Sequence, residues 1–273
     1  MAYLSSERTI LSLEELVECL KSEQEPPSDA VVVTLDDAYQ DFYLNAYPIL
    51  RDFDVPCTVF LITGLLGDGI PKWDDWIARL VNETEASSLS IHLGGREVLY
   101  SLGSGVNKRN CIVDLVKAFH DLTDTELQPS ITQVENALHH GHDVALQRVT
   151  LRWSEVMKIS KETCLVSFGA HTRSHPNLLN ICVERAEDEI ASSKREIERR
   201  LGRQCFFFSY PYGAFDERTK ELVRQNGFLA ATITRPGSIS VGADLFELRR
   251  VSAPNQALGD FISFLAKFDR GSY

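Results

Sequence analysis

The sequence has no apolar run that approaches the roughly 20 residues a membrane-spanning helix needs. Its first residues show neither the basic stretch nor the apolar stretch of a secretory signal peptide. It also has no CxxC pair, and its six cysteines lie far apart, so we expect free thiols in a reducing compartment. These absences predict a cytoplasmic protein without a membrane span.

Basic residues are also scarce relative to acidic ones. Lysine and arginine total 28 against 39 aspartates and glutamates, a formal net charge of −11. Nucleic acid and anionic membrane surfaces both favour basic patches, so neither is expected as the main partner. With 44% hydrophobic and 25% charged residues, the 273-residue chain has the composition of a globular protein that buries a core. No internal repeat or low-complexity segment is visible.

Near-continuously apolar strands alternate with amphipathic helices along most of the chain. The strands are predicted at residues 31–35, 57–63, 164–170, 205–208, 229–234 and 246–251. The helices are predicted at about 13–21, 40–53, 153–159, 184–201, 216–226 and 261–268. Strands of this kind are buried on both faces, as in parallel βα units. An open doubly wound sheet and a barrel both fit the pattern.

The pattern changes between about residues 67 and 152. Helices are expected near 73–80, 111–121 and 130–140, with a hairpin over 88–102. Because this region lacks long apolar runs, it is predicted to be an insertion or lid on a single catalytic domain spanning 1–273, rather than a separate core. It also contains a polar cluster formed by His139, His140, His142 and Asp143. A surface loop is expected there, since neighbouring histidines rarely converge on one ion without a supporting frame.

Two adjacent carboxylates, Asp36 and Asp37, follow the β-branched strand at 31–35. A single aspartate there would most often cap the next helix by accepting hydrogen bonds from its free N–H groups. Two neighbouring acids at a strand end, where the backbone turns, can instead serve different tasks around one point. The pair therefore favours a functional site.

Three polar segments follow three predicted strands: Asp36-Asp37, His171 to His175, and Tyr210 to Gly213. In parallel α/β folds, sites are built at this carboxyl edge. The i,i+4 spacing of His171 and His175 suits a divalent metal ion, which a carboxylate commonly completes. The alternatives are a histidine that hydrogen-bonds a strand end and simple turn chemistry before Pro176.

Such a centre, with two imidazoles, one carboxylate and open positions, suits hydrolysis. The ion polarises a carbonyl and lowers the pKa of its water, and a second carboxylate can act as general base. Backbone N–H groups of Tyr212 and Gly213 would lie near a developing oxyanion. The alternative for that segment is a proline-aromatic turn that packs on the core.

At these residues the chain resembles the polysaccharide deacetylase family (the NodB-homology type, carbohydrate esterase family 4). Its T-F-D-D motif matches Thr34 to Asp37, its H-[ST]-x-x-H motif matches His171 to His175, and its R-x-P-Y motif matches Ser209 to Tyr212. The resemblance spans about residues 12–255. It implies a distorted (β/α) barrel with about seven or fewer strands, and metal-dependent removal of an acetyl group from a sugar.

The resemblance also implies the roles of individual residues. Asp36 would be the catalytic base, and the metal would be held by Asp37, His171 and His175. The backbone of Tyr212 would help to hold the oxyanion. Further substrate contacts are expected from the neighbouring motif and from the last strand: Tyr210, Pro211, Gly213 and Arg249. The metal would be one divalent ion, with zinc the first choice and cobalt, manganese or nickel also suited.

The chain departs from the family pattern at several places. Ser209 replaces the arginine that orients the base, so Asp36 needs another partner, for which Arg249 and Arg250 are the candidates. No histidine follows His175, so the family's late general acid is absent, and a water or a histidine of the insertion would have to protonate the leaving group. The chain also starts too late to include the strand ending in Tyr-His that opens many family members before the first helix, which would leave the barrel open on that side.

The expected substrate is an acetylated amino sugar of a glycan or glycan precursor. Two other hypotheses remain open. One is a hydrolase of the same fold acting on a cyclic imide or ureide, which the missing acid and arginine would allow. The other is a catalytically weak carbohydrate-binding or structural protein. Bound metal together with acetate release from acetylated sugars would favour the deacetylase hypothesis.

Overall fold

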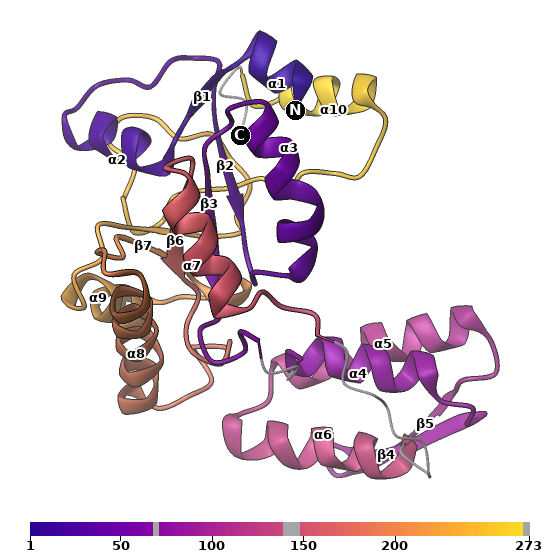
Figure 1. Cartoon of the computed structure of the whole chain (residues 1–273). Helices are drawn as coiled ribbons and strands as arrows, with labels where there is room; N and C mark the ends of the chain where they lie inside the picture. Colours follow the sequence, from indigo (N-terminus) through magenta and orange to yellow (C-terminus); the bar gives the residue numbers. More distant parts are fainter. Residues whose placement is uncertain (68–70, 139–147, 270–273) are drawn as a thin grey trace. The chain divides into compact units, whose positions relative to one another are not determined.

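A computed structural model of the chain describes residues 1–67, 71–138 and 148–269. The chain divides into two compact parts, which Figure 1 colours along the sequence. The barrel part consists of Met1–Gly67, Thr150–Leu179 and Val183–Tyr273. The insertion consists of Asp68–Val149 and Asn180–Cys182. The boundaries predicted from sequence, 67 and 152, lie close to the limits of the longer piece.

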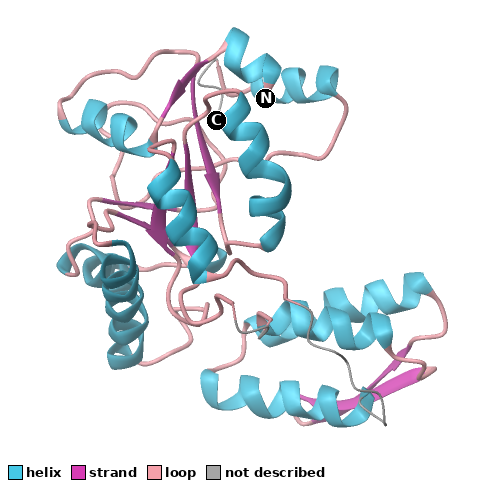
Figure 2. Cartoon of the chain, viewed as in Figure 1, coloured by secondary structure: helices cyan, strands magenta, loops and turns pink. Residues whose placement is uncertain are grey.

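One parallel sheet organises the barrel part. Its strands, in sheet order, are β1 (Thr9–Leu11), β2 (Ala30–Leu35), β3 (Cys57–Leu61), β6 (Val166–Ala170), β7 (Phe207–Ser209) and β8 (Ala230–Thr232). Every neighbouring pair is parallel. The sheet curls into a half-barrel with helices around it (Figure 2), which confirms the predicted distorted (β/α) barrel.

α-Helices surround this sheet in the described part of the chain. They are α1 (Ala2–Glu7), α2 (Leu13–Lys21), α3 (Tyr47–Asp52), α7 (Trp153–Glu162), α8 (Val183–Leu201), α9 (Glu217–Gln225) and α10 (Leu258–Leu265). A capping box of Ser12 and Glu15 begins α2, whose leucines pack in one cluster with Phe60 and Phe207 of the sheet. No helix in the described part of the chain combines the length and the apolar character needed to cross a bilayer.

Two strands differ from their predictions. The chain contains a strand before α2 that was not predicted: β1 pairs with β2 from Thr9 to Leu11. It ends at Leu11 and is followed by Ser12, so the expected absence of a strand ending in Tyr-His stays a prediction. Three residues are too few for a periodicity signal. Conversely, the segment predicted as a strand at 246–251 makes only one bridge among the described residues, between Leu248 and Thr232. A turn at Asp244, whose side chain accepts from the Phe246 N–H, shortens its pairing with β8.

The insertion has a hydrophobic core of its own, contrary to the sequence-based expectation. It contains α4 (Trp73–Glu83), the predicted hairpin of β4 (Ser88–Leu93) and β5 (Arg96–Ser101), α5 (Gly105–His120) and α6 (Asp124–Leu138). Leu115 and Val134 are fully buried in its cluster. The apolar residues come singly from amphipathic helices, so no long run announces them. The His139, His140, His142 and Asp143 cluster lies outside the described residues.

Close packing at Gly169 of β6 gives a stability prediction. A Cβ atom added there would lie 2.6 Å from two ring carbons of Phe60 and 2.9 Å from the Phe207 carbonyl oxygen. We expect Gly169→Ala to destabilise the barrel part by about 1–3 kcal/mol through overpacking, seen as a lower Tm. Gly259→Ala is the matched control, since a Cβ there meets nothing within 4 Å and alanine favours the helix. Equal Tm values for the two variants would contradict this prediction.

Candidate metal centre and active site

The three polar segments predicted from sequence all lie at the carboxyl edge of the sheet. Asp36 and Asp37 follow β2, and the His171 loop follows β6. Ser209 ends β7 and leads into a 3₁₀ turn, Pro211–Gly213. Parallel strands bring their carboxyl ends to one edge, which is why segments far apart in sequence can form one site.

Backbone strain is concentrated in these segments. Five non-glycine residues in them adopt positive φ: Asp37 (68°), Ala38 (54°), Thr172 (64°), His175 (63°) and Tyr212 (60°). For a β-branched threonine this conformation is rare, and such strain persists only where surrounding bonds enforce it. The Thr172 hydroxyl accepts from the His175 N–H at 3.0 Å and donates to the His171 carbonyl. These local bonds hold the loop between the two imidazoles.

Three possible metal ligands converge here: Asp37, His171 and His175. The two Nε2 atoms lie 3.1 Å apart, and each is 3.5 Å from Asp37 Oδ1. Nitrogen and oxygen ligands bound tetrahedrally at about 2.1 Å from zinc would lie about 3.4 Å from one another. Both histidine side chains are only 3% exposed, and Asp37 is 15% exposed. The spacing and chemistry of the donor set therefore fit a divalent cation.

The hydrogen bonding of His171 supports the same interpretation. Its Nδ1 lies 2.7 Å from the Ser209 carbonyl oxygen, which can only accept, so Nδ1 carries the proton. In the neutral ring, Nε2 then presents its lone pair toward His175 and Asp37. Metal-bound histidines usually donate their other N–H to such a partner, which fixes both tautomer and ring orientation.

Asp36 has a different environment from its neighbour. Arg250 donates from Nη1 to Oδ1 and from Nη2 to Oδ2, both at 2.7 Å. The Ser209 hydroxyl also donates to Oδ2, at 3.3 Å. Burial raises the pKa of Asp36, but nearby His171, Arg250 and Ser209 together lower it below its usual value. Asp36 is thus held as a carboxylate beside the candidate metal centre.

Arg250 is the one of the two candidate arginines that reaches Asp36. Its guanidinium also donates to Ser209 Oγ at 2.9 Å and to Thr34 Oγ1 at 3.2 Å. Ser209 stands where the family has an arginine. It therefore belongs to the same hydrogen-bonded group as Arg250, the arginine that pairs with Asp36 instead. Arg249 is exposed and lies against Gly237. Its expected role as a substrate contact stays a prediction.

The segment from Tyr210 to Gly213 contributes unequally. The Tyr212 ring meets the His175 ring edge-on, with centroids 4.6 Å apart. The Gly213 N–H donates to the Tyr210 carbonyl at 2.9 Å, so it is used within the turn and not aimed at an oxyanion. Tyr210 is fully buried and stacks on Phe215, and Pro211 is also buried. For these two side chains the structure matches the packing alternative considered from sequence.

Two participants were missed by sequence reasoning. The Ser209 carbonyl, which orients His171, is a main-chain group and has no sequence signal. Glu189 accepts hydrogen bonds from the loop between the two histidines. Its signal was available, because Glu189 falls on the buried face of α8 with Ile190 and Ser193. A carboxylate on an apolar helix face is rarely there without partners.

A family model for polysaccharide deacetylases matches residues 23–93 and 119–231, more than half of the chain. The Bacillus subtilis (strain 168) protein YxkH, whose name places it among the polysaccharide deacetylases, is 20% identical over 232 residues. That match covers 85% of this chain and 54% of YxkH, so the chain spans about half the length of this relative.

Two further comparisons agree with the family match. A Staphylococcus aureus poly-β-1,6-N-acetyl-D-glucosamine N-deacetylase is 36% identical over 64 residues, 23% of this chain and 22% of that protein. The structure of the Streptococcus pyogenes deacetylase PplD in complex with acetate superposes with a TM-score of 0.61 at 19% identity. The superposition covers 97% of this chain and 83% of PplD, and it shows that the two chains share a fold.

Proposed function

The chain belongs to the polysaccharide deacetylase family, and from that premise we propose that it is a metal-dependent hydrolase. Its substrate would be an acetylated amino sugar of a glycan or glycan precursor. One observation carries the proposal: two adjacent acids lie in different electrostatic surroundings. Asp37 faces two imidazole nitrogens, whereas Asp36 faces a guanidinium. Carboxylates in contrasting environments are a common basis for dividing binding and proton transfer.

The residues that would hold the metal are Asp37, His171 and His175. A divalent ion bound there, zinc first with cobalt, manganese or nickel also suited, supplies Lewis acidity that polarises the acetyl carbonyl and lowers the pKa of a water. The three side chains leave positions of the coordination sphere for substrate, as hydrolytic sites require. The hydrogen bond from His171 to Ser209 keeps one ligand nitrogen in the required tautomer.

Asp36 acts as the general base in this proposal. Its Oδ1 accepts one hydrogen bond from the described residues, whereas its Oδ2 accepts two. A carboxylate oxygen has two lone pairs, so Oδ1 can take a proton from the attacking water. Arg250 fixes the orientation of the carboxylate without using this capacity. The lowered pKa keeps Asp36 ionised, and thus able to accept the proton, at neutral pH.

The same carboxyl group then protonates the leaving amine. Water adds to the acetyl carbonyl carbon while its proton passes to Asp36 Oδ1. The carbon–nitrogen bond breaks and the amine nitrogen takes that proton, so the products are a free amino sugar and acetic acid, which keeps the second proton of the water and ionises to acetate at neutral pH. In this proposal Asp36 takes the place of the water or insertion histidine considered from the sequence, because it already holds the proton beside the breaking bond. The Tyr212 N–H is the backbone donor assigned to the oxyanion.

Acetate release from acetylated sugars tests the proposal. Purified protein would be freed of metal with a chelator, reloaded with zinc, and given N-acetylglucosamine oligomers of increasing length. We expect acetate and free amine to form in equal amounts, only after reloading. Hydrolysis of a cyclic imide without acetate release would support the amidohydrolase alternative. Metal binding without turnover of any acetylated sugar would contradict a catalytic role.

Arg250 gives a separate prediction as the positioning residue for Asp36. We expect Arg250→Gln to lower kcat for acetate release about 100-fold, because a carboxylate misplaced by about 1 Å loses its alignment with the substrate. The metal content should remain that of the wild type, since Arg250 touches none of the proposed ligands. Steady-state kinetics and metal analysis of the same preparation would check both statements.

Arg249→Gln is the comparison that separates the two neighbouring arginines. Arg249 is exposed and forms no ion pair with Asp36, so its loss should leave kcat unchanged and act, if at all, on KM. A large fall in kcat for Arg249→Gln with little effect of Arg250→Gln would overturn this assignment of the base's partner.

A further inference from the structure

Glu189 of α8 makes three hydrogen bonds to the loop that connects His171 and His175. Its Oε2 accepts from the N–H groups of Arg173 and Ser174 at 2.9 and 2.8 Å. Its Oε1 accepts from the Ser174 hydroxyl at 2.5 Å. Glu189 is only 5% exposed, so its charge depends on these donors for stabilisation. The carboxylate therefore fixes both backbone amides midway between two proposed metal ligands.

The opposite side of the same loop is held by the end of β3. The Thr63 N–H donates to the Thr172 carbonyl at 3.2 Å, and the Gly64 N–H donates to the Arg173 carbonyl at 2.8 Å. A Cβ atom at Gly64 would lie 2.6 Å from that carbonyl oxygen, so glycine permits the close approach. The loop carbonyls are thus bonded by Thr63 and Gly64 after β3, and the loop amides are bonded by Glu189.

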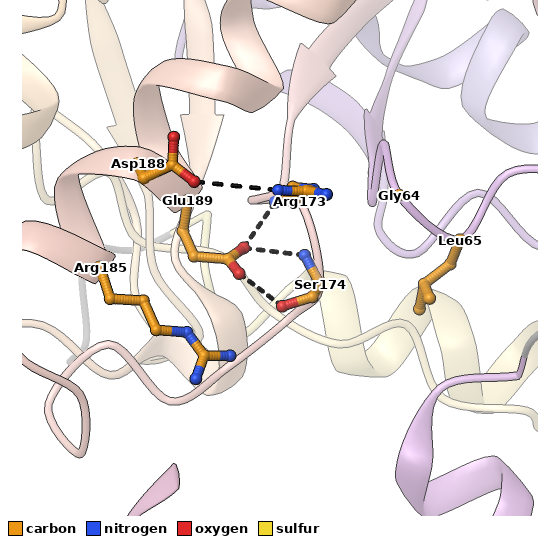
Figure 3. Close-up of a pocket in the computed structure, with 7 residues that line it drawn as sticks. All are labelled: Gly64, Leu65, Arg173, Ser174, Arg185, Asp188 and Glu189. Atoms are coloured by element: carbon orange, nitrogen blue, oxygen red, sulfur yellow. Dashed lines mark hydrogen bonds and ion pairs between the residues drawn. The ribbon is translucent and has the colours of Figure 1, made fainter.

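A cavity of about 470 Å³ lies beside this contact. It is lined by Gly64, Leu65, Arg173, Ser174, Arg185, Asp188 and Glu189. Figure 3 shows the Glu189 carboxylate directed at the loop, with its hydrogen bonds drawn. Water in a cavity of this size could satisfy the loop amides if the carboxylate were removed. A truncated side chain should therefore loosen the loop without preventing folding.

We propose that Glu189 is a positioning residue of the metal centre, which presets the strained His171–His175 loop for the ion. This inference rests on the proposed metal-dependent function. Thr172 and His175 keep their positive φ because the backbone between them is fixed on both sides. Without Glu189 the loop relaxes, and the two imidazoles must be brought back into register when the ion binds. That cost lowers metal affinity even though Glu189 does not touch the metal.

Metal titration of the metal-free protein tests this role. We expect Glu189→Ala to weaken zinc binding about 10- to 100-fold, the range seen when partners of ligating residues are lost. Glu189→Gln should bind within about 3-fold of the wild type, because its carbonyl oxygen can accept both amides and its NH₂ can donate to Ser174. Asp188→Ala is the matched control: the side chain of this neighbouring acid is 59% exposed and, in the described structure, pairs with the side chains of Arg173 and Arg195, not with the loop backbone.

The outcomes are distinguishable. Glu189→Ala with an unchanged zinc Kd but a lower Tm of the metal-free protein would reduce Glu189 to a structural role and overturn the proposal. So would equal weakening by Asp188→Ala, or a Glu189→Gln variant as weak as the alanine variant. If Glu189→Ala fails to fold, Ser174→Ala replaces it, with an expected loss of about 3- to 10-fold and no effect as the contrary result. A wild-type protein that binds no zinc would instead refute the metal-dependent function itself.

Discussion

Replacing Asp36 with asparagine is expected to lower kcat for acetate release by about 10²- to 10⁴-fold, the usual contribution of a general base. The amide cannot take the proton from water. One of its two terminal atoms also becomes a donor that faces the Arg250 guanidinium, where the carboxylate accepted two bonds at 2.7 Å. Metal content should remain that of the wild type, because the three proposed ligands are intact. Single-turnover kinetics and metal analysis would measure the two effects separately.

Asp52→Asn is the matched control for this substitution. It makes the same chemical change at an acid that is 66% exposed and pairs only with its neighbour Arg51 in the described structure. Its activity should equal that of the wild type. If the Asp36→Asn enzyme keeps full activity, the base has been assigned to the wrong residue. If it loses the metal instead, Asp36 is a ligand and the division of labour between the two acids is wrong.

Replacing His175 with alanine is expected to remove the metal. The substitution takes away one of three converging donor atoms and also the edge-on contact with Tyr212. We expect zinc affinity to fall by more than about 100-fold, since loss of residues that merely orient ligands already costs 10- to 100-fold. Zinc at 100 times the wild-type Kd should stabilise the wild type by about 2.7 kcal/mol and leave the variant nearly unaffected. Thermal unfolding with and without zinc would measure this difference.

His92→Ala supplies the comparison for that experiment. His92 is an exposed histidine on β4, remote in sequence from the proposed ligands. Its replacement should preserve the zinc-dependent rise in Tm. A His175→Ala protein that keeps this rise would show that the ion binds elsewhere, and the proposed centre would then have no support.

The main elements of the site were predictable because they depend on local sequence. Asp36 and Asp37 follow an unmistakable β-branched run, and His171 and His175 follow another apolar strand. Topology then brings strand ends together, whichever α/β architecture forms. The choice between Arg249 and Arg250 was also within reach. Alternate residues of an extended segment face the same side, and buried Leu248 stands two positions before Arg250.

Other features could not be read from the chain. The strand β1 has three residues, too few for a period to show. The predicted strand at 246–251 pairs with β8 at a single bridge and begins beside a side-chain–backbone bond at Asp244, a local competitor that hydrophobicity does not reveal. The insertion hides its core because each helix contributes a stripe of single apolar residues. The Ser209 carbonyl illustrates a general limit: main-chain groups act in the site without leaving a trace in residue identity.

The residues of the barrel part that flank the insertion in the sequence are joined to each other by hydrogen bonds. The Thr150 hydroxyl donates to the Leu65 carbonyl at 2.7 Å, and the Leu151 N–H donates to the Ala38 carbonyl at 2.9 Å. The longer piece of the insertion lies between these anchors in the sequence, and the insertion has a hydrophobic core of its own. Apart from the short stretch at 180–182, its content can therefore diverge without disturbing the catalytic scaffold. A foreign module could be grafted between these two anchors as one continuous segment.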